Sequence, residues 1–370
     1  MKNLSRNLLI AATIIVAGFL VYTFRSIVSY VLIAWVLSMI GQPLTRFFQR
    51  RLRIGKWTAG PITGAVLTIL CFFIVLISLI LVFVPMFIQQ AGNLATVDYS
   101  AIARTIEEPI RHFQEWLNSR GIFFDAKAPE EWLKNMFAST FDPTRIGAII
   151  SAVFSAASGL IVDISCIVFI TFFFLKEQGL FVNFITVLVP AKYESKILEA
   201  VDIISRLLTR YFAGMLLQMF VITIYVSLLL TILGVKNALL IGFFAALMNV
   251  IPYLGPFIGG ALGIIITITS NVDLDFYSQL LPLLIKVALV FATVQMLDNY
   301  FLSPYIFSSS VLAHPLEIFL VILMGAQISG IAGMILAIPV YTVLRVIAKE
   351  FLNQFRVVQA LTDKMEEEGY

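Results

Sequence analysis

The sequence predicts an all-α, polytopic integral membrane protein, and three observations lead to this prediction. First, the chain of 370 residues is 60% hydrophobic and only 13% charged, whereas soluble domains carry about a quarter charged residues. Second, the apolar residues lie in long runs, such as 8–24, 62–84 and 146–175, and a helix needs roughly 20 apolar residues to cross a bilayer. Third, short basic segments separate some of these runs. We expect about six full transmembrane helices and two re-entrant helical hairpins, with eight full spans as the alternative.

The N-terminal membrane region, 1–88, begins with two apolar segments, 7–24 and 27–41. The loop that follows, 42–58, carries five basic residues and no acidic ones. Basic loops are retained on the cytoplasmic side, so we place this loop and the N-terminus in the cytoplasm. A third span, about 60–88, then leads outside.

A polar segment, 89–145, follows the third span and is predicted to be a small helical extracytoplasmic insertion. Its Ile102, Ile106 and Ile110 recur at helical spacing. The next region, 146–233, contains a fourth span, a cytoplasmic amphipathic helix at 192–210 and a fifth span.

The region 234–350 differs from the rest because its apolar runs are interrupted. Segments 237–251 and 257–270 flank Pro252, Gly255 and Pro256, and each is too short as a helix to cross the bilayer. A second pair, 316–328 and 331–347, is broken at Gly330 and Gly333. Two broken pairs that enter from opposite sides are typical of inverted repeats in secondary transporters. The tail 351–370 is predicted to be cytoplasmic.

Several function classes are disfavoured by what the sequence contains. No phosphate-binding G-x-x-x-x-G-K-[ST] sequence occurs, which argues against ATP hydrolysis by this chain. The two cysteines, Cys71 and Cys166, lie in apolar runs without metal-ligand spacing. The net charge of +3 is small, and its basic residues are clustered between spans. We expect no enzyme activity, no cofactor, no metal and no nucleic-acid partner.

Polar groups at membrane depth are the candidate functional residues, because such groups are costly unless they face a pathway or a partner. The turn from Asn249 to Pro256 exposes backbone groups that could contact a solute or an ion, or it is a plain turn between two spans. Gln295, Asp298 and Asn299 share one helical face and could bind a cation, a proton or a polar solute, or could cap a helix end. The candidate ligand-binding set is Asn249, Pro252, Gly255, Pro256, Gln295, Asp298, Asn299, Asp163, Glu317 and Gln327.

Two of these carboxylates have alternative interpretations. Asp163 lies within the fourth span and could carry a proton or a cation, or lie near the outer interface. Glu317 lies in a first helical turn, where the helix dipole already favours an anion. A further set is interpreted as hairpin breaks or close packing positions: Pro304, Pro315, Gly330, Gly333 and Pro339.

These stretches give the chain a resemblance to the autoinducer-2 exporter (AI-2E) family of prokaryotic membrane proteins. The resemblance is carried by Asn249 to Pro256, by Gln295 to Pro304, and by His314-Pro315 through Gly330 and Gly333 to Pro339. Ser308-Ser309-Ser310 depart from it, since a glycine is expected there. The resemblance implies a transporter without an ATPase, re-entrant hairpins, and a homo-oligomer, a pentamer among the arrangements it allows.

The function predicted from residues and resemblance together is a secondary transporter of the prokaryotic cytoplasmic (inner) membrane. Similar proteins export the quorum-sensing signal autoinducer-2, and others exchange sodium or lithium for protons. We therefore expect export of a small polar molecule such as autoinducer-2, with Na⁺(Li⁺)/H⁺ antiport as the alternative. A membrane scaffold acting through 89–145, or a channel, is a further alternative. The expected partners are the lipid bilayer, a small molecule or monovalent cation, and further copies of the chain.

Overall fold

The computed structural model describes residues 22–51, 53–54, 57–58, 60–96, 161–187, 189–271, 274–310 and 313–355, with isolated residues in 16–20, 111–120 and 358–362. Most of the predicted insertion 89–145 and most of the tail 351–370 lie outside these residues. The chain forms two compact units. The first comprises Met1–Val75 and Ser155–Ser205, and the second comprises Leu76–Phe154 and Arg206–Tyr370.

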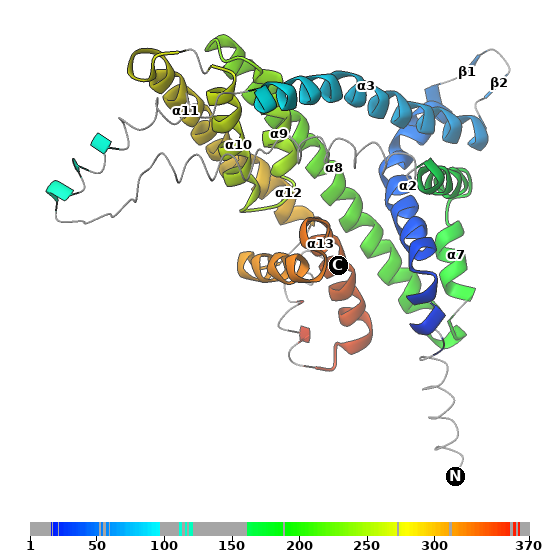
Figure 1. Cartoon of the computed structure of the whole chain (residues 1–370). Helices are drawn as coiled ribbons and strands as arrows, with labels where there is room; N and C mark the ends of the chain where they lie inside the picture. Colours follow the sequence, from blue (N-terminus) through cyan, green and yellow to red (C-terminus); the bar gives the residue numbers. More distant parts are fainter. Residues whose placement is uncertain are drawn as a thin grey trace. The chain divides into compact units, whose positions relative to one another are not determined.

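The first unit contains α2 (Arg25–Arg51), a two-stranded antiparallel pair of β1 (Arg53–Ile54) and β2 (Trp57–Thr58), and the first part of α3 (Pro61–Thr96). Its later part contains the helix Ile161–Lys176, α7 (Leu180–Val187), the 3₁₀ turn η1 (Ala191–Tyr193) and the start of α8 (Glu194–Ile232). These elements are labelled in Figure 1, except the helix Ile161–Lys176 and η1.

Small residues bring α2 close to α3. The hydroxyl oxygens of Thr45 and Thr68 lie 2.7 Å apart, and a Cβ on Gly41 would lie 3.0 Å from the Thr68 methyl group. The segment 42–58, predicted as a loop, is helical as far as Arg51, and Pro43 lies within this helix. The basic residues Arg46, Arg50 and Arg51 are therefore presented from the last turns of a helix.

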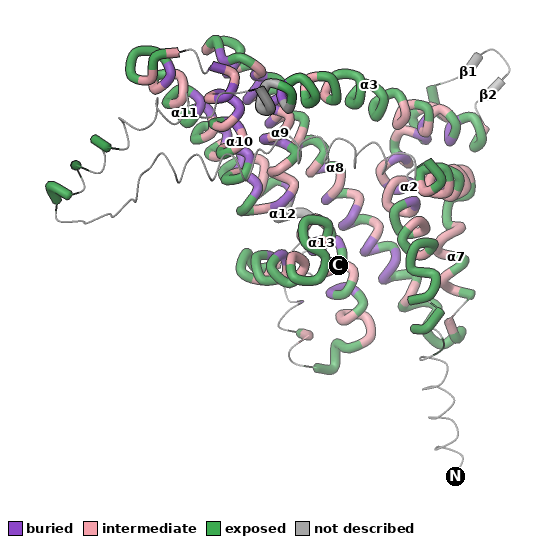
Figure 2. The backbone as a smooth tube through the Cα atoms, in the orientation of Figure 1, coloured by how far each residue is buried: buried purple, intermediate pink, exposed green. Residues whose placement is uncertain are grey.

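The helices confirm an all-α polytopic membrane protein. Within the described residues, five helices are long and apolar enough to cross a membrane: α2, α3, α8, the α11–α12 stretch and α13. A sixth is added if the helix Ile161–Lys176 and α7, which bend by 95° at their junction, form one broken span. Most residues of α3 are exposed, as Figure 2 shows. Apolar surface of this kind suits contact with lipid.

The first predicted hairpin is present in the second unit as two short helices, α9 (Ala238–Met248) and α10 (Gly255–Thr269), which lie side by side (Figure 1). Glycines on α10 allow the close approach, since a Cβ on Gly259 would lie 3.1 Å from the Ala245 Cα. The turn between the helices includes Tyr253, which has a positive φ of 67°. How deeply this hairpin enters a membrane remains a prediction.

The second hairpin lies within α13 (Pro315–Leu352). Its backbone leaves helical geometry at Ser329 (φ −144°, ψ 24°) and Gly330 (φ 56°, ψ −133°). After this break the chain folds back, and the two arms come into close contact. A Cβ on Gly325 would overlap the carbonyl of Gly333, and a Cβ on Gly333 would overlap the carbonyl of Gly325. The backbone thus reverses at Gly330, and Gly333 lies against Gly325 of the opposite arm.

The remaining elements of the second unit form one long interrupted helix. They are η2 (Phe276–Leu280), α11 (Leu281–Leu297), η3 (Asp298–Leu302) and α12 (Ser303–Ser310), and η2 and η3 are π-helical turns. A buried apolar core joins this helix to α8, α9 and α10; it consists of Ile222, Val226, Leu230, Val235, Ala238, Leu240, Ile241, Ala245, Ala246, Ile266, Val287, Val290 and Val294. A smaller core packs α13 against Tyr211 of α8 and Ile251 of the hairpin turn.

A buried polar network ties the ends of the first hairpin to α3. The Gln90 amide donates to the Thr269 hydroxyl at 3.0 Å, and the Asn237 amide donates to the Gln90 carbonyl at 2.9 Å. Asn237 also donates to the Ser270 hydroxyl at 3.0 Å. Because these side chains hydrogen-bond to one another, the amide of the buried Gln90 has partners.

Candidate functional site

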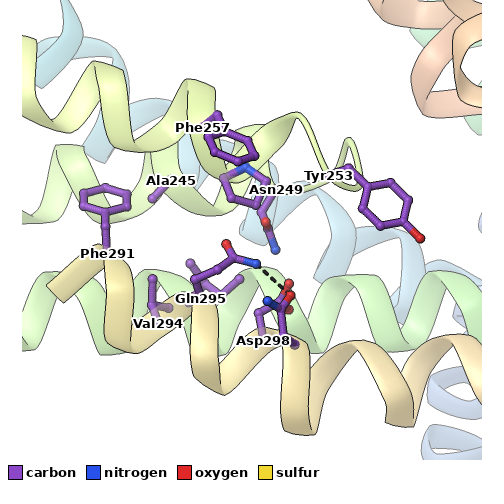
Figure 3. A pocket seen from close by; sticks show the side chains of 11 residues that line it. Ala245, Asn249, Tyr253, Phe257, Phe291, Val294, Gln295 and Asp298 are labelled. Carbon is purple, nitrogen blue, oxygen red and sulfur yellow. Dashed lines mark hydrogen bonds between the residues drawn. The ribbon is translucent and has the colours of Figure 1, made fainter. Parts of the chain in front are cut away.

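A cavity of about 350 Å³ lies between α8, α9, α10 and α11 in the second unit. Figure 3 shows it from close by, with side chains from both arms of the first hairpin above α11. The residues that line it are Ile222, Ala245, Asn249, Tyr253, Pro256, Phe257, Phe291, Val294, Gln295, Asp298 and Asn299. Five of them belong to the predicted ligand-binding set: Asn249, Pro256, Gln295, Asp298 and Asn299.

Asp298 is the charged group of this cavity, and its side chain is only 6% exposed. Gln218 of α8 donates from its amide nitrogen to Oδ1 of Asp298 at 2.5 Å. The hydroxyl of Ser303 donates to Oδ2 at 3.2 Å. A buried carboxylate requires such donors, because an unpaired buried charge is very costly. Both donors are neutral groups, so they leave the charge of Asp298 uncompensated.

The position of Ser303 depends on the π-helical turn η3. In an α-helix, residues three and four apart face each other, and residues five apart do not. A π-helical turn instead closes hydrogen bonds between residues five apart, and here the Ser303 N–H donates to the Asp298 carbonyl. The wider turn therefore places the serine hydroxyl beside the Asp298 carboxylate.

Gln295 and Asn299 occupy the same face of the helix as Asp298, as their spacing predicts. The Gln295 amide nitrogen donates to Oδ1 of Asn299 at 2.8 Å, which is a normal contact for residues four apart. Both residues line the cavity. Two amides and one carboxylate are thus presented together from the end of α11.

Asn249 contributes an amide from the opposite side of the cavity, at the C-terminus of α9. Its Nδ2 atom is buried and has no hydrogen-bond partner among the described residues. The amide lies near the Asp298 carboxylate, but the two groups do not meet normal hydrogen-bond geometry. Figure 3 shows Asn249 pointing from the hairpin toward Gln295 and Asp298. An unpaired donor and a carboxylate acceptor therefore lie close together inside one cavity.

The other walls of the cavity are apolar and aromatic. Phe291 of α11 packs beneath α10, where Gly263 leaves room for its ring. Tyr253 lies in the hairpin turn, and its ring contacts Phe319 of α13 edge-on at 6.1 Å between centroids. A cavity with polar groups at one end and apolar walls elsewhere is typical of small-molecule sites.

Two predicted residues of the first hairpin shape its turn without lining the cavity. Pro252 and Gly255 lie in or beside the turn, and the Gly255 N–H donates to the Ile251 carbonyl at 2.8 Å. A Cβ on Gly255 would overlap the Met248 carbonyl, so only glycine fits there. Pro304 lies in α12 directly after the π-helical turn η3, and it is not among the residues that line the cavity.

Asp163 belongs to the first unit, and it is not among the residues that line the cavity. It accepts a 2.5 Å hydrogen bond from the hydroxyl of Tyr30 on α2. The sequence around Asp163 offers no obvious partner, and Tyr30 lies 133 residues earlier in the chain. Whether Asp163 carries a proton or a cation is untested.

The predicted residues of the second hairpin also lie outside the cavity lining. Glu317 accepts a 2.6 Å hydrogen bond from the Tyr341 hydroxyl in the opposite arm, so it has a specific partner in addition to the helix dipole. Gln327 is exposed near the break. Pro315 begins α13, and Pro339 is buried within its second arm. None of these four residues is among those that line the cavity.

The predicted ligand-binding set leaves out the following supports and walls of the cavity: Gln218, Ser303, Tyr253, Phe257, Phe291, Ile222, Ala245 and Val294. Gln218 was detectable as a polar residue within the apolar run 211–233, which is the signal used for the other candidates. The aromatic residues give no comparable signal, because 32 phenylalanines occur in the chain.

The described residues contain no group of three or more histidine, cysteine, aspartate or glutamate side chains that could hold a metal ion. The donor set around Asp298 is one carboxylate with amides and a hydroxyl. These groups suit hydrogen bonding to a polar solute, or transient contact with a hard cation through oxygen ligands.

Comparison with known proteins agrees with this architecture. A family model described as "AI-2E family transporter" matches residues 9–353. The chain is 28% identical over 336 residues to "Putative transport protein YueF" of Bacillus subtilis strain 168, covering 89% of this chain and 84% of the relative. It is 31% identical over 185 residues to "Putative transport protein YrrI" of the same organism, covering 50% of each chain.

Proposed function

Because the chain belongs to the AI-2E transporter family, we propose that it is a secondary transporter that exports a small polar molecule, such as autoinducer-2, through the cavity around Asp298. The single observation that carries this proposal is that two buried groups line the same cavity: the Asn249 Nδ2 donor, which has no hydrogen-bond partner among the described residues, and the Asp298 carboxylate. A solute that offers an acceptor atom to the amide and a hydroxyl to the carboxylate satisfies both groups. Buried polar groups favour such a ligand strongly, since leaving them unpaired costs about 1–3 kcal/mol each.

The dimensions and walls of the cavity support an organic solute. Its volume of about 350 Å³ is in the range of small-molecule pockets, which runs from roughly 300 to 1,000 Å³. Phe257 and Phe291 supply apolar surface beside the polar end. A bare monovalent cation would use the oxygens alone and leave the aromatic walls without a role.

Sodium (or lithium)/proton antiport is the second candidate, and one observation favours it. The hydrogen-bond donors described for the Asp298 carboxylate, Gln218 and Ser303, are both uncharged. A buried carboxylate whose charge is not compensated can be neutralised by a proton or by a cation, and exchange between the two is antiport.

Flux in proteoliposomes separates these functions. Purified protein is reconstituted, and uptake of labelled autoinducer-2 is compared with a sodium-driven pH change inside the vesicles. Solute uptake without a pH change supports the exporter, and Asp298→Asn is then expected to weaken uptake without affecting insertion. A pH change that disappears in Asp298→Asn establishes antiport instead. If the wild-type protein gives neither signal, both functions are wrong for these substrates.

The cellular setting is part of the same proposal. We place the protein in the prokaryotic inner membrane with both termini in the cytoplasm, since basic residues gather at 46–56 and in the last helix and tail. We also propose a homo-oligomer. Labelling of single cysteines introduced at each terminus with an impermeant reagent tests the orientation, and mass measurement of the detergent-solubilised protein tests the assembly.

A further inference from the structure

The Asp298 carboxylate is held from two sides by residues that the transport proposal does not itself require. Gln218 reaches Oδ1 from α8, and Ser303 reaches Oδ2 from the π-helical turn of its own helix. Each carboxylate oxygen therefore has one dedicated donor. Side chains with such fixed partners lose their rotational freedom, which is how supporting residues orient a functional group.

The hydrogen bond between Gln218 and Asp298 joins two buried side chains. Asp298 is 6% exposed and Gln218 is 7% exposed, so water does not substitute readily for the amide. Gln218 lies in a stretch of α8 that is otherwise apolar, and a polar side chain in such a position usually serves a partner. Its partner here is Asp298, 80 residues later in the chain.

The π-helical turn is the second part of the arrangement. A π-helical turn is rare and is frequently found at functional sites. At η3 the π-helical turn brings the Ser303 hydroxyl next to the Asp298 carboxylate. An uninterrupted α-helix would turn this hydroxyl away from the carboxylate.

We propose that Gln218 and Ser303 are positioning residues: together they fix the Asp298 carboxylate so that its remaining lone pairs face the Asn249 amide and the solute between them. This inference rests on the proposed function of the cavity. It assigns substrate contact to Asp298 and Asn249, and it assigns to Gln218 and Ser303 a role that acts through Asp298.

The test combines a spectroscopic signal of Asp298 with transport. Infrared difference spectra of the reconstituted full-length protein, recorded on changing pH, are expected to contain the C=O band of the Asp298 carboxyl group and to lack it in Asp298→Asn. In Gln218→Met and Ser303→Ala this band is expected to shift in frequency, because each variant removes one donor. Ser303→Thr keeps a hydroxyl and is expected to leave the band in place.

A matched control comes from the other buried glutamine network. Gln90→Met removes a glutamine that is 4% exposed and bonded to Thr269 and Asn237, outside the cavity lining. It is expected to lower thermal stability while leaving the Asp298 band unchanged. In labelled autoinducer-2 uptake, Gln218→Met and Ser303→Ala are expected to raise KM about tenfold, because a carboxylate that is no longer held in place loses about one good hydrogen bond to the solute. Gln90→Met is expected to leave KM unchanged.

The outcomes separate this inference from the proposed function. A band that stays in place in both Gln218→Met and Ser303→Ala overturns the positioning role, whatever is transported. A band that shifts in both variants supports the positioning role, even if the wild-type protein moves neither autoinducer-2 nor sodium, in which case the proposed function fails alone. A KM that rises equally in Gln90→Met contradicts the inference, because the effect would then be one of general stability.

Discussion

The Tyr341 hydroxyl donates a 2.6 Å hydrogen bond to Glu317, although the two residues are 24 positions apart in what is formally one helix. In a straight helix 24 residues extend about 36 Å. The contact is possible because Ser329 and Gly330, midway between the partners, leave helical geometry and reverse the chain. Gly325 and Gly333, which also flank the break symmetrically, let the two arms touch.

Tyr341→Phe is expected to loosen this hairpin. The variant removes one partly buried hydrogen bond to a carboxylate, and bonds to charged groups contribute about 1.5–3 kcal/mol to the free energy of unfolding. Unfolding in mixed micelles measures the loss. Tyr277→Phe is the control, because that ring is 48% exposed outside the hairpin. Equal stability of the two variants would show that the bond contributes nothing.

Gly330→Ala is expected to destabilise the break itself. At φ 56° and ψ −133°, a residue with a Cβ is strained, at a cost of about 1–3 kcal/mol. No atom lies within 4 Å of the added methyl group, so any loss of stability reports backbone strain and not a clash. Gly92→Ala, also in open space but within a helix, is expected to be neutral or slightly stabilising. A neutral Gly330→Ala would mean that the reversal does not need this conformation.

Much of the architecture could be predicted from the sequence, because the bilayer imposes a length on apolar helices. The short arms expected at 237–251 and 257–270 correspond to α9 and α10, and the break expected at Gly330 lies where the backbone reverses. The predicted amphipathic helix 192–210 and the predicted fifth span form one continuous helix, α8, and no proline or glycine interrupts 194–213.

The candidate site could be predicted only in part. Gln295, Asp298 and Asn299 share a helical face, which spacing alone indicates. The contact between Gln218 and Asp298 spans 80 residues, and no local pattern specifies which polar residues of different helices meet. The π-helical turn that brings in Ser303 is likewise set by tertiary packing, since the α-helical period places that side chain elsewhere.

Tyr30→Phe tests whether Asp163 has a structural role in the first unit. The tyrosine hydroxyl is the donor described for Asp163, and its removal is expected to cost about 1 kcal/mol in stability, since the pair is only partly buried. Tyr22→Phe, with a ring 71% exposed on the chain segment before α2, is the control. If Tyr30→Phe leaves stability intact and yet changes the pH dependence of flux, Asp163 belongs to the transport machinery instead.

Asn249→Leu tests the amide side of the cavity. The variant keeps the approximate volume of the side chain but removes the donor that lacks a protein partner. We expect KM for labelled autoinducer-2 to rise about tenfold, the effect of losing one hydrogen bond to a buried group. Unchanged uptake would place the solute away from Asn249.

Gly263→Ala tests whether the apolar wall sets the size of the cavity. A Cβ at this position would lie 2.7 Å from Cε2 and 2.9 Å from Cζ of Phe291, which is too close for any real contact. The ring therefore has to move, and the open space beside it is the cavity that it lines. We expect a higher KM for autoinducer-2 and a stability loss of about 1–3 kcal/mol from overpacking.

Gly260→Ala provides a control that faces the same ring. A Cβ there would lie 3.7 Å from Cδ1 of Phe291, an ordinary van der Waals contact. The same chemical change one helical turn earlier is thus expected to leave both KM and stability near the wild-type values. If Gly263→Ala lowers stability but leaves KM unchanged, the ring has moved without narrowing the transport site, and Phe291 is then a packing residue only. If both variants raise KM equally, the effect comes from stiffening α10, since alanine restricts the backbone at either position.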